Sequence, residues 1–204
     1  MSLRVGGQCL LIGGIGSILS SLLVFLIPGP VGISGPGSIP ANVVMILSGL
    51  FLLVGVPALY RAQARQVGTL GLVGTVFLWV AIILGWLVLS SVEILDVAMP
   101  SSIPHPGGEG PPPLALIPAI LGELCFLIGG LIVGIKTIRA HVFPAAVGWV
   151  ILIAAELLIP GTIAGNGNLM LDVIFMSGEI ALMCAGLAWA GAALSFQRIT
   201  PEVA

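Results

Sequence analysis

The chain has 204 residues, of which 58% are hydrophobic and 7% are charged, and its formal net charge is −2. Soluble domains carry about 25% charged residues, so this composition excludes a water-soluble fold. The small net charge excludes the basic surface of a nucleic-acid-binding protein. The composition therefore predicts an integral membrane protein with lipid as its main partner and no nucleic-acid partner.

Six apolar runs follow one another along the chain, and each is long enough for a membrane-spanning helix, which needs about 20 residues. Membrane strands are not expected, because the runs lack the alternation of apolar and polar residues that a β-barrel requires. The sequence predicts an all-α, polytopic bundle of six transmembrane helices in a single domain, 1–204. The predicted helices cover residues 6–27, 42–60, 69–98, 114–135, 144–163 and 171–196.

The charged residues predict the orientation of the bundle. With six spans, all Lys and Arg residues fall on one side, and the other side carries only acids. The positive-inside rule then places both termini in the cytoplasm of a multi-pass cell-membrane protein. We expect short basic loops at 62–68 and 137–143 on the inner side. The basic residues are Arg4, Arg61, Arg65, Lys136, Arg139 and Arg198, and the outer acids are Glu93, Asp96, Glu109 and Asp172.

Small residues and one proline predict how the helices pack. Close helix contact in lipid depends on small residues, so Gly13 and Gly14, Gly130 and Gly134, and the stripe that includes Gly191 are expected at helix seams. Pro57 lies inside the second run and has no backbone N–H to donate, which predicts a kink there.

Three acids interrupt the later apolar runs. At 1.5 Å of rise per residue, Glu123 and Glu156 lie about 20 Å and about 18 Å from the inner boundary, and Glu179 lies about 10 Å from the outer one. In a hydrocarbon core about 30 Å thick, the three share one level. A charged carboxylate there costs about 2.5–3.5 kcal/mol or more. No Lys or Arg lies at this depth in the sequence, so we expect at least one of the acids to be protonated at neutral pH.

These acids are the candidate ligands for a proton, a cation or a small solute. Glu123, Glu156 and Glu179 would form the site, and Asp172 and Glu93 would lie at its mouth. Trp79, Trp86, Met176 and Met183 are candidates for its lining, since Trp79, Trp86 and Glu93 are spaced by seven residues and share a helix face. Two interpretations stay open, because protonated acids can also serve only as hydrogen-bonding contacts between helices.

The sequence gives little support for a metal site, a cofactor site or a known hydrolase motif. His105 and His141 are the only histidines and fall on opposite sides of the membrane, and there is no HExxH, GxSxG or P-loop motif. We therefore expect no cofactor and no metal. The catalytic residues of any enzyme are unknown from the sequence. The three cysteines, Cys9, Cys125 and Cys184, are predicted to be packing residues.

Three functions are compatible with this pattern. The leading one is a carboxyl-lined pocket in the outer half of the bilayer that binds or translocates a proton, a cation or a small solute. The second is an integral membrane enzyme that uses a protonated Glu as general acid on a lipophilic, isoprenoid-like substrate, with Trp79 and Trp86 lining the cavity. The third is a non-catalytic subunit or scaffold of a membrane complex. A homo-oligomer or a larger complex, and a small or lipophilic ligand, stay open as partners.

Several local motifs resemble those of bacterial six-helix membrane proteins that are grouped under domains of unknown function. The shared features are a glycine-rich first helix, the Pro28-Gly29-Pro30 loop, Leu59-Tyr60-Arg61-Ala62 and Ile138-Arg139-Ala140-His141. The resemblance implies a six-helix membrane fold over most of the chain and implies no catalytic residues.

Overall fold

The computed structural model describes residues 2–26, 38–99, 113–164 and 169–196. All regular structure in these ranges is helical, which confirms the predicted all-α class. The elements are α1 (Leu3–Leu26), α2 (Ser38–Ile82), the π-helix η1 (Ile83–Leu89), α3 (Ser90–Ala98), α4 (Pro113–Ala140), α5 (Ala145–Ala164) and α6 (Leu169–Phe196). Four candidate membrane spans lie in the described ranges, at Leu3–Leu23, Ser38–Ala98, Leu116–Ala140 and Ile174–Phe196, so this is a multi-pass membrane protein.

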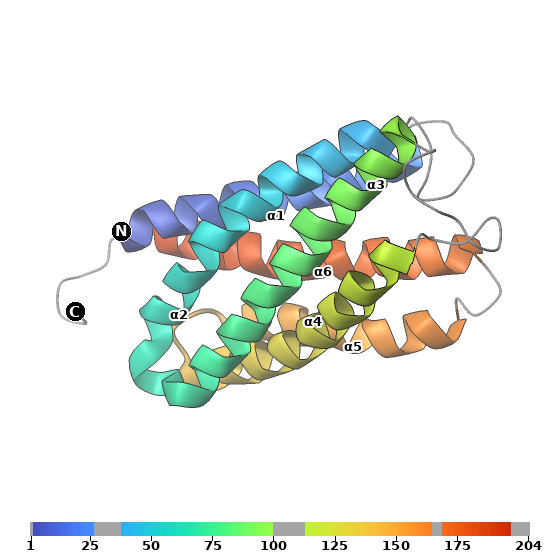
Figure 1. The fold of residues 1–204 in the computed structure, drawn as a ribbon. Helices are drawn as coiled ribbons and strands as arrows, with labels where there is room; N and C mark the ends of the chain where they lie inside the picture. Colours follow the sequence, from blue (N-terminus) through green and yellow to red (C-terminus); the bar gives the residue numbers. More distant parts are fainter. Residues whose placement is uncertain (1, 27–37, 100–112, 165–168, 197–204) are drawn as a thin grey trace.

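The longest element, α2, doubles back on itself at Gly68 (Figure 1). Gly68 has φ 59° and ψ −155°, a conformation that is open to glycine and strained for other residues. No atom outside its immediate surroundings lies within 4 Å of the position a Cβ would occupy, so the backbone conformation, and not lack of space, explains the glycine. The arm after Gly68 continues through η1 into α3.

The predicted inner loops are mostly helical. Residues 62–67 continue α2 up to the turn, and α4 runs on to Ala140. The loop predictions at 62–68 and 137–143 were therefore too long. Hydropathy does not report helicity, and the Gln, Arg and Ala residues of 62–67 are good helix formers although they are not part of an apolar run.

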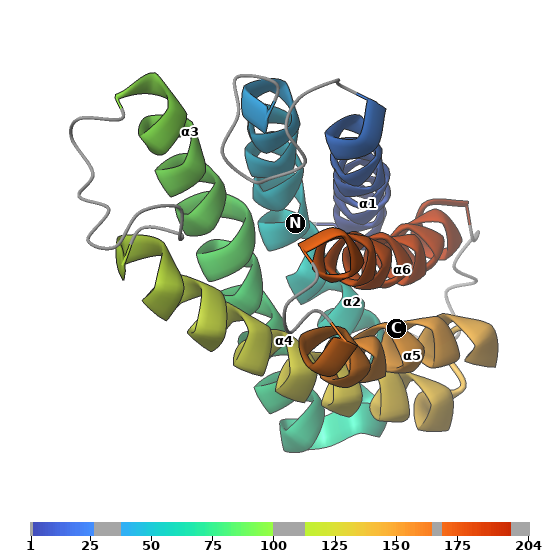
Figure 2. The same ribbon diagram turned by 90° about the vertical axis from the view of Figure 1, so that its right-hand side faces the viewer.

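The helices follow one another round the bundle, and α1 closes it against α6 (Figure 2). Glycines make the closing contact, because a Cβ on Gly191 would lie 2.5 Å from the carbonyl oxygen of Gly7, and one on Gly14 would lie 2.6 Å from that of Cys184. On the other side of the bundle, a Cβ on Gly134 would lie 3.0 Å from the carbonyl oxygen of Gly148 on α5. The predicted glycine seams are thus confirmed as helix contacts.

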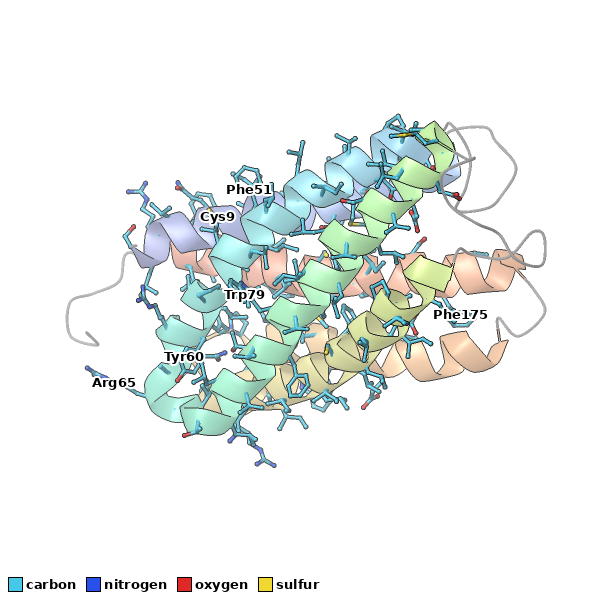
Figure 3. All side chains as sticks on the ribbon, viewed as in Figure 1. Cys9, Phe51, Tyr60, Arg65, Trp79 and Phe175 are labelled. Atoms are coloured by element: carbon cyan, nitrogen blue, oxygen red, sulfur yellow. The ribbon has the colours of Figure 1, made fainter. Side chains whose placement is uncertain are left out.

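The two ends of the bundle differ in charge. The described basic residues gather at the end that holds the start of α1, the Gly68 turn and the end of α4, which we call the basic end. Figure 3 shows Arg65 and Tyr60 at this end and Phe175 toward the opposite end. The basic end carries Arg4, Arg61, Arg65, Lys136 and Arg139.

Candidate functional site

Two acids of α3 lie beside the beginning of α2, at the end opposite the basic end. Asp96 is 7% exposed and Glu93 is half-buried. The side chain of Asn42 on α2 donates a hydrogen bond to the Glu93 carboxyl group, and Asp96 lies three residues after Glu93 on the same side of α3. Two carboxyls and an amide, from two helices, therefore meet at this end of the bundle.

Among the predicted acids whose side chains the structure describes, Glu179 of α6 is the most deeply buried, at 6% exposed. One turn nearer the basic end, Met183 is buried against α4, and its methyl carbon would lie 2.8 Å from a Cβ on Gly130. The Met183 side chain of α6 therefore reaches α4 at that level, although α4 and α6 each have more contact with α5 than with each other.

Glu123 lies on the same face of α4 as Gly130, because seven residues make about two turns. It is half-buried. Measured from the Gly130–Met183 contact, Glu179 is about 6 Å and Glu123 about 10 Å farther from the basic end. Helix rise thus places Glu123 and Glu179 within about 5 Å of each other in level, on α4 and α6.

Glu156 is not part of this group. Its side chain is exposed, on the face of α5 that also carries Trp149 and Ile153, which are 53% and 48% exposed. Ala154 and Ala155 face inward and are buried. Glu156 therefore does not face the interior with the other two acids of the predicted layer. The error arose because α5 is apolar on every side, so the sequence does not indicate which face points inward.

The π-helix η1 carries Trp86 into the centre of the bundle. Its indole Nε1 donates a hydrogen bond to Oγ of Ser17 over 2.9 Å, and the Ser17 hydroxyl is also hydrogen-bonded to the Cys184 thiol. Its ring stacks on Phe126, with centroids 6.3 Å apart and planes at 21°. Four elements, α1, η1, α4 and α6, are therefore joined around one buried tryptophan.

Trp79 lies outside the buried cluster around Trp86. It is 41% exposed and lies between the two arms of α2 (Figure 3), where its Nε1 donates a hydrogen bond to the carbonyl oxygen of Leu53 over 2.7 Å. The prediction that Trp79 and Trp86 line one wall is not supported. Seven residues bring a helix back to the same face only in an α-helix, and the wider π turns begin between these two tryptophans.

Three predicted site residues remain, and two of them, Met176 and Met183, have described side chains on α6. Met183 is buried and Met176 is half-buried on α6. The side chain of Asp172 lies outside the described residues, as do Glu109 and Arg198. Among the described residues, no group of three or more His, Cys, Asp or Glu side chains could hold a metal ion.

Three residues that contribute to this region were not among the predicted site residues. Asp96 is three residues after Glu93 and so shares its side of α3, a spacing that could have identified it. Asn42 is an amide at the start of an apolar run, which is a weaker signal. Ser17 is one of several serines in α1, and nothing in the sequence distinguishes it as the partner of Trp86.

Apart from Glu156, the described acids lie at two places in the bundle. Glu93 and Asp96 lie near the end of the bundle, and Glu123 and Glu179 lie on α4 and α6. The Trp86–Phe126 stack lies between α4 and η1. The resemblance to bacterial six-helix membrane proteins stays a prediction. Comparisons of the chain with protein-family models, with curated proteins and with solved structures found no match.

Proposed function

We propose that this chain is a six-helix protein of the cytoplasmic membrane, with both termini in the cytoplasm. Its acid-lined interior, in the outer half of the bilayer, binds or translocates a proton, a cation or a small solute. Six crossings follow if the 61-residue span Ser38–Ala98, which reverses at Gly68, crosses twice and if α5 also crosses. The gathering of the described basic residues at one end supports a cytoplasmic location for that end.

The burial of Asp96 and Glu179 is the observation that carries this proposal. An ionised acid within an apolar bundle costs about 2.5–3.5 kcal/mol on insertion scales, and such residues are usually kept where they act on protons or ions. Helix packing alone does not require carboxyl groups, since small and apolar residues supply it throughout this bundle.

The two groups of acids would act in sequence. Glu93, Asp96 and Asn42 would receive the solute at the outer end, and Glu123 and Glu179 would hold it farther in. Carboxylate and amide oxygens suit hard cations, and a carboxyl group can also take up or release a proton. The stacked rings of Trp86 and Phe126 would separate this region from the cytoplasmic side.

Flux measurements on the purified protein in vesicles test the proposal. Proton, Na⁺ and K⁺ movement would be followed under an imposed gradient for the wild type, Asp96→Asn and Glu179→Gln. Loss of a charged ligand should lower flux or binding about tenfold or more. Glu156→Gln is the matched control, because it makes the same chemical change on an exposed face, and it should behave as the wild type. Wild-type behaviour of both Asp96→Asn and Glu179→Gln would refute the proposal.

The topology needs its own measurement. In a background without the three native cysteines, single cysteines at Arg65, His141 and Met99 would be exposed to a membrane-impermeant thiol reagent. Positions 65 and 141 should react only from the cytoplasmic side and position 99 only from outside. Reaction of 65 and 99 from the same side would contradict two crossings by Ser38–Ala98.

A further inference from the structure

Glu156 is an acid on the outer surface of the bundle. It is the twelfth residue of the 20-residue helix α5, so about 16 Å of helix separates it from the first residue of that helix. Its side chain is exposed, and no hydrogen bond or ion pair to another residue is found for it in the described part of the chain. If α5 crosses the membrane, as proposed above, this carboxyl group faces lipid.

Apolar surface surrounds Glu156. Trp149 and Ile153 are exposed on the same face of α5, and Leu124 and Ile128 are exposed on the adjoining α4. A carboxyl group in hydrocarbon is unfavourable unless it has a partner. Trp149, about two turns away on the same face, is a side-chain type that is enriched at protein contacts.

We propose that this face of α5 binds a transmembrane helix of a different membrane protein, one that carries a Lys or Arg near the middle of the bilayer. The partner's cation would pair with the Glu156 carboxylate, and its apolar side chains would pack on Trp149 and Ile153. This pairing depends on the proposed crossing by α5 and is independent of flux through the interior.

A second copy of the chain does not fit this surface equally well. In the same membrane a copy has the same orientation, so its described basic residues lie at the basic end and not at the level of Glu156. Two copies could bring only carboxyl or apolar groups together there. Complementary charge therefore requires a different chain.

A synthetic helix tests the inference directly. The purified protein, labelled with a fluorescent donor, would be mixed in phosphatidylcholine vesicles with an acceptor-labelled polyleucine transmembrane peptide that has one central lysine. Two control peptides have methionine in place of the lysine, or the lysine seven residues nearer one end. Energy transfer should report association about three- to tenfold tighter for the central-lysine peptide than for either control.

Variants at position 156 complete the test. Glu156→Gln should abolish the preference for lysine, and Glu156→Asp, which keeps the charge, should retain part of it. Equal association of the lysine and methionine peptides with the wild type would overturn the inference. So would a preference for lysine that survives Glu156→Gln, or Glu156-dependent energy transfer between two copies of the protein.

Carbodiimide labelling separates this inference from the proposed function. Modification of Glu156 by an apolar carbodiimide, and not by a water-soluble one, would support its location in lipid. The reverse pattern would overturn both the crossing by α5 and the pairing. If Glu156 reacts with the apolar carbodiimide only, but the protein shows no preference for the lysine peptide, the pairing alone is overturned. The flux of Glu179→Gln bears only on the interior acids.

Discussion

The indole N–H of Trp79 donates a hydrogen bond to the backbone carbonyl of Leu53, with 2.7 Å between nitrogen and oxygen. Leu53 is four residues before Pro57, which lies inside α2 and has no N–H to give that carbonyl. One arm of α2 thus supplies the donor that the other arm lacks. This bond explains how the helix continues past Pro57.

Replacing Trp79 by Phe should cost about 1 kcal/mol of unfolding free energy, because the Leu53 carbonyl loses its donor. In a Pro57→Ala background the cost should be smaller, since the new backbone N–H at position 57 can bind the Leu53 carbonyl in the ordinary helical manner. A double-mutant cycle measured by unfolding in detergent micelles gives the coupling. An equal cost in both backgrounds would show that the two residues act independently.

Replacing Gly191 by Ala should lower the unfolding free energy by about 1–3 kcal/mol. Its Cβ would lie 2.5 Å from the Gly7 carbonyl oxygen and 2.6 Å from the Leu11 nitrogen, and backbone atoms cannot rotate away. Gly178→Ala on the same helix is the control. No atom outside its immediate surroundings lies within 4 Å of that Cβ, and alanine favours the helix by up to about 1 kcal/mol. Equal losses at both positions in thermal unfolding would contradict the contact.

Ser17→Ala should destabilise the protein by about 1–3 kcal/mol, because the Trp86 N–H becomes a buried donor without an acceptor. Trp86→Phe keeps a ring to stack on Phe126 and removes that donor. The double variant should therefore be more stable than the sum of the two single losses indicates. Strict additivity of the two losses in chemical unfolding would argue against the hydrogen bond.

The buried side chains of Gln63 and Thr137, near the basic end, form a second hydrogen bond whose loss should lower the unfolding free energy. Gln63 Nε2 donates to Thr137 Oγ1 over 3.2 Å, and Gln63 Oε1 has no hydrogen-bond partner in the described part of the chain. Thr137→Val alone should cost about 1–3 kcal/mol, and Gln63→Met with Thr137→Val should cost much less, because both polar partners are then removed. A double variant that is less stable than Thr137→Val would contradict this expectation.

The lengths of the helices could largely be predicted from the sequence. The run 69–98 ends where α3 ends, at Ala98, and the prediction for 171–196 reaches the last residue of α6. Length is predictable because the thickness of the bilayer sets it. The continuation of α2 from Arg61 to Val67 was not predicted, since helix outside lipid leaves no mark in hydropathy.

The rotation of each helix was much harder to predict. Glu156 and Glu179 have similar sequence surroundings, yet one is exposed and the other is buried. In water, apolar residues identify the inward face of a helix. In lipid both faces are apolar, so an acid in an apolar helix can be located in depth and not in direction. The π-helix that orients Trp86 likewise gave no periodic signal.

The contact of Gly7 with Gly191 has a consequence for biosynthesis. Each helix from α2 to α5 meets a neighbour that the ribosome has already made or makes next, but α1 meets α6 only when the chain is almost complete. During synthesis, the α1 surface that carries Gly7 and Gly14 therefore has no partner until α6 has been made. Premature termination before α6 would leave that glycine-lined surface open to the helices of other nascent proteins.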